Sequence, residues 1–234
     1  MVKNELLECL LREKEARHSN GVIYYYTQTK MAYNSNRFEG NRLSEDQVRE
    51  IFLKNTILSS NNIPVDINDI IKTINHFNAF DYMLEIAREP LTEKVIKKFH
   101  FLLNRGTICE YTKDRIEAYI NNQNMESILS EYAINILLEK YNTLIKKSLH
   151  NLIEFYMQFE MIHPFKEGNG KVGRLILFKE CLNSGIMPFI IMKDFRLYYK
   201  REINDYEKKK RYLNEICLLS QDQYRTICKY FQII

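Results

Sequence analysis

The sequence predicts an all-α protein. Only 7 of its 234 residues are glycine and 4 are proline, too few for many short strands joined by tight turns. Apolar residues instead recur at helical spacing along most of the chain. The hydrophobic content of 45% and the charged content of 27% are typical of a soluble globular protein. The length suits one sizeable core better than two full domains.

Spacing and capping residues divide the chain into a series of helices. Ser44 and Gln47 form a capping-box pattern, and Gly40 is suited to a left-handed helix end. Apolar residues between 66 and 87, Ile67 and Ile74 among them, are expected to face inward. The helices are expected over residues 2–17, Val22–Phe38, a segment that begins at Ser44, 66–87, Thr92 to about Leu103, 126–147 and 149–162. The last of these is apolar on nearly every side, which predicts a buried central helix.

Charge, cysteine usage and the chain start predict the environment of the protein. A net charge of +4 permits an anionic ligand but does not indicate a nucleic-acid binder. Five widely spaced cysteines without zinc-ligand spacing favour reduced thiols. The acidic residues near the start do not fit a signal peptide, and no apolar stretch is long enough to span a membrane. A cytoplasmic protein is expected.

The segment His163–Arg174, HPFKEGNGKVGR, has the pattern of an anion-binding loop. Pro164 ends the preceding helix, and apolar periodicity restarts after Gly170, so a new helix begins near the glycines. Free backbone N–H groups and the positive end of the helix dipole meet at such a start. The segment therefore predicts a phosphate cradle.

The side chains of this loop fit the same chemistry. His163 is a candidate general base, and Glu167 offers a carboxylate to a magnesium ion. Lys171 and Arg174 lie in the first turn of the new helix, where cations are unfavourable unless an anion is bound. A P-loop is excluded because Val172 occupies the position of its Ser or Thr. The histidines 18, 76, 100 and 150 show no metal-ligand spacing and are expected to be surface or packed residues.

This loop closely resembles the signature of the Fic family, with Lys171 in place of its first arginine as the one departure. The resemblance implies a helical core with a short β-hairpin flap at residues 108–122, which would hold a target protein as an added strand. It also implies ATP as substrate, Mg²⁺ as cofactor, and transfer of AMP to a Ser, Thr or Tyr hydroxyl. The implied roles are His163 as base, Glu167 as metal ligand, and Gly168, Asn169, Gly170, Lys171, Arg174 and Tyr199 as phosphate- and ATP-binding residues.

A second motif, Ser35–Asn41, resembles the inhibitory pattern of the same family. Ser35 and Glu39 lie four residues apart and face one side of a helix, expected over about 22–40 and followed by Gly40. By resemblance, Glu39 would compete with ATP for Arg174 and could support removal of AMP. Residues 1–60 are then expected to be N-terminal helices that include the inhibitory helix, and residues 61–234 the catalytic core.

Two alternatives stay open from the sequence. The first is transfer of UMP, phosphocholine or phosphate on the same scaffold, although Gly170 argues against phosphate because relatives that transfer phosphate have lysine there. The second is a catalytically weak, toxin–antitoxin-like binding module, which Lys171 and the short flap would favour. The target protein, self-AMPylation and assembly into a homo-oligomer are not determined by the sequence.

Overall fold

The computed structural model describes residues 2–16, 22–57, 64–107, 125–195 and 206–233. In these ranges the chain is helical and contains no strand, so the all-α prediction is confirmed. The expected flap at 108–122 and Tyr199 lie outside the described residues. The helices are α1 (Val2–Glu15), α2 (Val22–Phe38), α3 (Glu45–Lys54), α4 (Ile67–Glu85), α5 (Glu93–Asn104), α8 (Met125–Asn142), α9 (Leu149–Ile162), α10 (Asn169–Ser184), the 3₁₀ turn η1 (Lys193–Phe195) and α12 (Tyr206–Tyr230).

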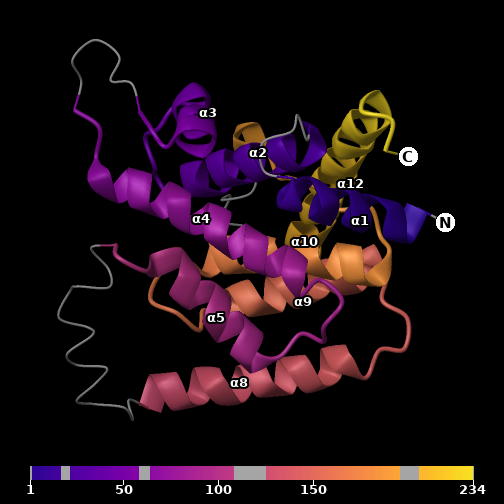
Figure 1. Ribbon diagram of the computed structural model, residues 1–234. Coiled ribbons are helices and arrows are strands. Elements are labelled where there is room, and N and C mark those ends of the chain that lie inside the picture. The colour runs from indigo at the N-terminus through magenta and orange to yellow at the C-terminus, as the bar shows by residue number, and fades with distance from the viewer. Residues whose placement is uncertain (1, 17–21, 58–63, 108–124, 196–205, 234) are drawn as a thin grey trace.

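Helix α10 lies at the centre of the arrangement (Figure 1). It packs against α1, α2, α4, α5 and α9, and residues 171–182 are all buried. Helix α9 lies between α10 and α8, and its buried middle fits the prediction, although Met161 near its end is exposed. The helix that carries the loop's two cations is therefore the most enclosed element among the described helices.

Local capping sets most helix boundaries. Ser44 and Gln47 form the predicted capping box at the start of α3, and Thr92 caps α5 by accepting from the backbone N–H of Val95. Ser148 opens α9 in the same way by accepting from the N–H of Asn151. These short-range bonds satisfy N–H groups that a helix start leaves without partners.

Two expectations from apolar spacing were wrong. Helix α8 ends at Asn142, not at residue 147, because Ile145 lies fully exposed and no burial stabilises a further turn. Ile67 and Ile74 face solvent rather than the core. Both stand on the side of α4 away from its packed face, so helical spacing alone overestimated the width of that face.

Buried charges join α10 to its neighbours. Lys179 and Glu180 form an ion pair at 2.9 Å, and both side chains are almost completely buried. Glu180 also accepts a hydrogen bond of 2.7 Å from the hydroxyl of Tyr141 on α8, while Lys179 donates to the carbonyl of Glu89. Each buried charge thus has a partner, which is the condition for keeping charges inside a core.

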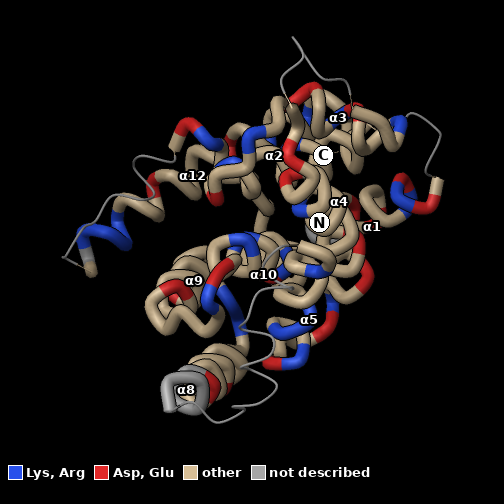
Figure 2. Tube along the Cα trace, turned by 90° about the vertical axis from the view of Figure 1, so that its left-hand side faces the viewer, with Lys and Arg blue, Asp and Glu red and all other residues tan. Residues whose placement is uncertain are grey.

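Three features bear on the expectations from composition: the basic run at the start of α12, the cysteines and the lengths of the helices. Lys208, Lys209 and Arg211 on the first turns of α12 are exposed, as expected for a solvated helix face. Figure 2 shows how basic and acidic positions are distributed along the chain trace. Cys9, Cys181, Cys217 and Cys228 are free and buried, and burial raises the pKa of each thiol. Among the described helices, none is both long and apolar enough to cross a membrane.

Gly173 allows α9 and α10 to approach closely. A Cβ atom at this position would lie 2.5 Å from Cε2 of Tyr156, a buried ring on α9. Real Cβ atoms do not approach this closely, and a ring packed in the core has little room to move. The glycine is therefore required by packing, despite its low helix propensity.

Replacing Gly173 by alanine is expected to destabilise the protein by about 1–3 kcal/mol, because overpacking outweighs the gain in helix propensity. Urea unfolding measures the change. The control is Asn183→Ala, an exposed position on the same helix, which gains propensity without a clash and is expected to be neutral or stabilising. A more stable Gly173→Ala variant would contradict the packing argument.

Candidate active site

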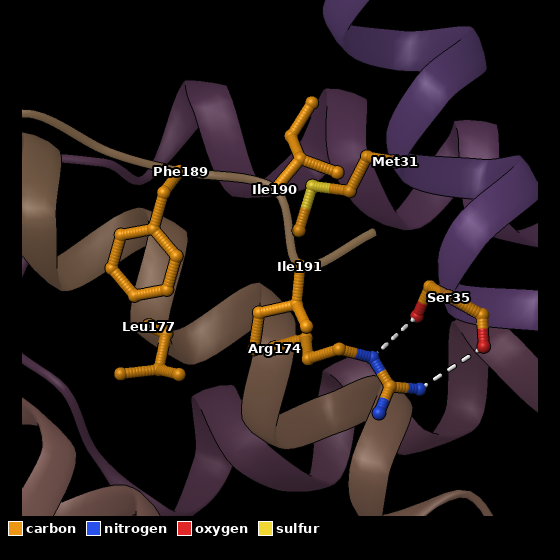
Figure 3. Close-up of a pocket in the computed structure, with 7 residues that line it drawn as sticks. All are labelled: Met31, Ser35, Arg174, Leu177, Phe189, Ile190 and Ile191. Atoms are coloured by element: carbon orange, nitrogen blue, oxygen red, sulfur yellow. Dashed lines mark hydrogen bonds between the residues drawn. The ribbon is translucent and has the colours of Figure 1, made fainter. Parts of the chain in front are cut away.

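The guanidinium of Arg174 lies against helix α2. Its Nε donates to the hydroxyl of Ser35 at 2.9 Å, and its Nη2 donates to the Ser35 carbonyl at 3.1 Å, as Figure 3 shows. Nη2 also contacts Oε1 of Glu39 at 3.3 Å. The predicted pairing of Glu39 with Arg174 is therefore present in the structure, across 135 positions of the sequence.

Arg174 is held in a largely apolar environment. Its side chain is only 6% exposed, and its guanidinium lies 4.9 Å from the ring centre of Phe38. Burial lowers the pKa of Arg174, whereas the carboxylates of Glu39 and Glu160 raise it. A small pocket beside it is lined by Met31, Ser35, Arg174, Leu177, Phe189, Ile190 and Ile191 (Figure 3). A cation so placed depends on nearby acceptors.

The absence of a side chain at Gly170 provides the space in which Arg174 and Glu39 make contact. A Cβ atom on Gly170 would lie 2.8 Å from Nη1 of Arg174 and 2.9 Å from Oε1 of Glu39. A side chain there would require the end of the Arg174 or the Glu39 side chain to shift. Gly170 therefore lies at the contact itself, and the segment from Ser35 to Asn41 meets the loop at this glycine.

Two residues with positive φ bound the loop between α9 and α10. His163 follows α9 with φ 51°, and Gly168 precedes α10 with φ 82°, a conformation that glycine adopts without strain. His163 is exposed. The turn thus presents an imidazole close to the N-terminus of α10.

The side chain of Asn169 bonds to the backbone and to a side chain of the loop that precedes α10. Its Oδ1 accepts from the backbone N–H of Phe165 at 3.0 Å. Its Nδ2 donates to the carbonyl of the same residue and contacts Nδ1 of His163. The contact engages one of the two ring nitrogens of His163. Asn169 therefore fixes both the loop backbone and the direction of the imidazole.

His100 on α5 holds the loop from the outside, a role the sequence did not predict. Its ring stacks on Phe165 at 3.9 Å between centroids and 11° between planes. Its Nε2 donates to the backbone carbonyl of Glu167 at 3.2 Å. No local pattern could have revealed this, because His100 and Glu167 are 67 positions apart.

Two further basic side chains lie buried near Arg174. Lys171 is 3% exposed, and burial lowers its pKa while Glu39 raises it. His76 on α4 is completely buried, and its ring nitrogens have no hydrogen-bond partner within the described part of the chain. Burial, with the positive charges of Arg174 and Lys171, lowers the pKa of His76 to about 3. His76 was expected as a surface or packed residue; the structure packs it beside the two cations.

The structure thus brings most of the predicted site residues together. Ser35, Glu39 and Gly40 come from the end of α2, and the segment from His163 to Arg174 from the α9–α10 turn. Gly40 follows α2 with φ 92°, as predicted. Glu167 is exposed at the loop. Tyr199 lies outside the described residues.

A family model matches half of the chain. The model is described as Fic/DOC family, and it matches residues 64–180. The matched stretch contains the whole loop from His163 to Arg174, whereas Ser35 and Glu39 precede it. A search of curated proteins found no match to the chain.

Solved structures of similar fold cover nearly the whole chain. A Fic domain containing signalling protein from Bacteroides thetaiotaomicron is 15% identical, with a TM-score of 0.69 over 93% of this chain and 95% of that one. Fic-1 from C. elegans is 17% identical, with a TM-score of 0.67 over 97% of this chain and 70% of that one. At these identities the likeness establishes the fold alone.

The buried neutral His76 is expected to make stability fall in acid. Its folded-state pKa of about 3 lies below the ordinary histidine pKa of 6.5, so the unfolded state binds a proton first as the pH falls. Stability is therefore present above about pH 6.5 and is lost below it, by about 2 kcal/mol between pH 7 and pH 5.

Urea unfolding of wild type and His76→Gln at both pH values measures this term, and the variant is expected to lose that part of the pH dependence. His150→Gln, at an exposed position, is the control, because it leaves the buried imidazole in place. Equal pH dependence in wild type and His76→Gln would contradict the assignment.

Proposed function

This chain belongs to the Fic/DOC family, whose members transfer nucleotide-derived groups to proteins, and we propose that it transfers AMP from ATP to a Ser, Thr or Tyr hydroxyl of a target protein. The observation that carries the proposal is an exposed His163 beside a helix N-terminus that holds two buried cations, Lys171 and Arg174. Such a start attracts a polyphosphate, and the imidazole can accept the proton of an incoming hydroxyl.

The proposed reaction is an in-line displacement. The imidazole of His163 takes the proton of the target hydroxyl while the hydroxyl oxygen forms a bond to the α-phosphorus of ATP. The bond between that phosphorus and the bridging oxygen breaks, and pyrophosphate leaves. Asn169, which contacts Nδ1 of His163, keeps the imidazole in one orientation. Chemistry of this kind depends mainly on positioning and on neutralising charge.

The residues present fit a magnesium ion held mainly by the substrate. Within the described ranges, no group of three or more His, Cys, Asp or Glu residues could hold a metal by itself. Glu167 offers one exposed carboxylate at the loop, and His100 holds its backbone carbonyl. Mg²⁺ typically takes one or two protein carboxylates and completes its shell with phosphates and water. Bound there, it would neutralise phosphate charge.

Glu39 is proposed to inhibit this reaction. Its carboxylate contacts the guanidinium that a γ-phosphate would need, and carboxylate and phosphate compete for the same donors. While Glu39 is in place, ATP would bind without its productive orientation. With AMP already on a target, the same carboxylate could assist the reverse, hydrolytic reaction, which we include in the proposal.

Labelling with α-³²P-ATP and with γ-³²P-ATP, in the presence of Mg²⁺ and a cell lysate, tests the reaction. The α-label alone is expected to transfer, weakly in wild type and strongly in Glu39→Gly. Adding His163→Ala should lower transfer by about 10²–10⁴-fold. Glu39→Gln, which keeps the size but removes the charge, is expected to lie between wild type and Glu39→Gly.

The other outcomes identify the alternatives. Transfer of the γ-label alone would indicate a kinase. Transfer only from UTP or CDP-choline would indicate UMP or phosphocholine transfer. If Glu39→Gly bound ATP but labelled no protein from any donor, the protein would act as a binding module and the proposal would be wrong.

Glu167→Gln is expected to raise the Mg²⁺ concentration required by at least about tenfold, because a neutral amide is a poorer ligand for a hard cation. Two measurements check this in the Glu39→Gly background: the Mg²⁺ dependence of transfer, and the Mg²⁺ dependence of ATP affinity by calorimetry. ATP affinity in EDTA should be unchanged. An identical Mg²⁺ dependence in both proteins would remove Glu167 from the proposed metal site.

A further inference from the structure

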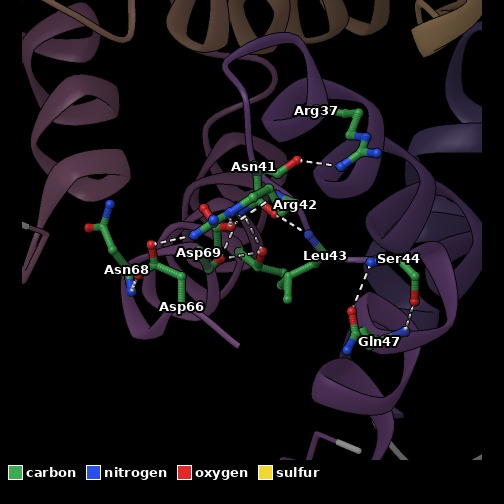
Figure 4. A network of polar contacts seen from close by, with 10 residues as sticks. Arg37, Asn41, Arg42, Leu43, Ser44, Gln47, Asp66, Asn68 and Asp69 are labelled. Carbon is green, nitrogen blue, oxygen red and sulfur yellow. Dashed lines mark hydrogen bonds and ion pairs between the residues drawn. The ribbon is translucent and has the colours of Figure 1, made fainter. Parts of the chain in front are cut away.

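The segment that follows the inhibitory motif is anchored to α4 by one buried side chain. Asn41 is 6% exposed, and all of its side-chain polar atoms are used. Its Nδ2 donates to the carbonyl of Asp69 at 2.9 Å and reaches the hydroxyl of Thr73 at 3.5 Å. Its Oδ1 accepts from the backbone N–H of Leu43 at 3.0 Å. Figure 4 shows Asn41 near Asp69 and Leu43.

The carboxylate of Asp69 completes the anchor. It accepts from the backbone N–H of Arg42 at 2.9 Å, and it is itself buried. The guanidinium of Arg42 also lies 3.6 Å from Asp69 and 2.8 Å from Asp66. That side chain is 73% exposed, so its ion pairs contribute little. The strong part of the anchor is therefore the set of buried bonds between Asn41, the Arg42 backbone and Asp69, here named the clasp.

The clasp is continuous with the helix end that carries Glu39. The backbone N–H groups of Glu39 and Asn41 both donate to the carbonyl of Asn36, at 3.0 and 3.1 Å. The side chain of Arg37 donates to the carbonyl of Asn41 at 2.8 Å. Asn41 is only two residues beyond Glu39, so the backbone of Glu39 is fixed from both sides: by Ser35 on Arg174, and by Asn41 on α4.

The contact of Glu39 with Arg174 depends on where the chain holds Glu39. The two side chains meet at 3.3 Å, with Arg174 6% exposed and Glu39 31% exposed. Forming such a pair costs conformational entropy if the chain that carries Glu39 must be ordered at the same time. The contact becomes favourable when the chain is already ordered, and the clasp supplies that order.

We propose that the clasp sets the strength of autoinhibition, with Asn41 and Asp69 as positioning residues for Glu39. This inference rests on the proposed function, since it concerns the regulation of the same site. Breaking the clasp lets the chain at Gly40 move, where φ is 92° and no heavy atom lies within 4 Å of a Cβ position. Glu39 then spends less time on Arg174, which becomes available to ATP. Neither Asn41 nor Asp69 touches the loop groups that would carry out the reaction.

The test compares Asn41→Ala with Arg42→Ala, with Glu39→Gly as the reference for full release. In the labelling assay Asn41→Ala is expected to raise transfer over wild type by at least about fivefold. Arg42→Ala removes only the exposed ion pairs and keeps the backbone N–H, so a change below about twofold is expected. In the Glu39→Gly background Asn41→Ala should add nothing, because Glu39 is already absent. Urea unfolding verifies that each variant is folded.

Two results of the labelling assay would overturn the inference. In the first, Asn41→Ala transfers no more label than wild type although Glu39→Gly is active. In the second, Asn41→Ala raises transfer equally in the wild-type and Glu39→Gly backgrounds. Hydrogen exchange separates this failure from failure of the proposed function. If Glu39→Gly transfers nothing, Asn41→Ala should still speed exchange at the amides of Glu39, Gly40 and Asn41, with little change in Arg42→Ala. Exchange as slow as in wild type would show that the clasp does not hold Glu39.

Discussion

The burial of Arg174 is the constraint on which the site depends. A guanidinium that is almost completely enclosed needs acceptors close by, because an unpaired charge in an apolar surrounding is very costly. Helix α2 supplies them through Ser35 and Glu39, and the ring of Phe38 covers the cation. The last turns of α2 therefore lie inside the protein, and Gly170 has no room for a side chain where the groups meet.

The positive charge of Arg174 also affects the groups around the loop between α9 and α10. Two cations at the start of α10 oppose the helix dipole, and no carboxylate other than Glu39 pairs with Arg174 among the described ion pairs. The neighbouring His76 stays neutral at neutral pH because burial, and then the positive charges of Arg174 and Lys171, lower its pKa. Such a site favours an anion with several charges. The loop that would receive it is held in place by Asn169 from within and His100 from outside.

Local patterns predicted the fold well where the interactions are themselves local. The starts of α3, α5 and α9 follow from capping residues that bond within three positions, and the turn at Gly168 follows from glycine's access to positive φ. The prediction of helix ends failed where the packing of side chains, rather than local bonding, determines the end. Helix α8 stops before the exposed Ile145, although apolar spacing continues.

The sequence by itself determined the site's chemical groups: an imidazole, a carboxylate and two cations around a Gly-Asn-Gly turn, with a second carboxylate at a helix end. Which of them meet depends on the tertiary structure, and before it only the family resemblance had implied that Glu39 pairs with Arg174. Contact between Glu39 and Arg174, stacking of His100 on Phe165 and the hold of Asn41 on Asp69 join residues 28 to 135 positions apart. A capping bond is fixed by the geometry of one turn, whereas these contacts depend on how α2, α4, α5 and α10 pack, which no short segment specifies.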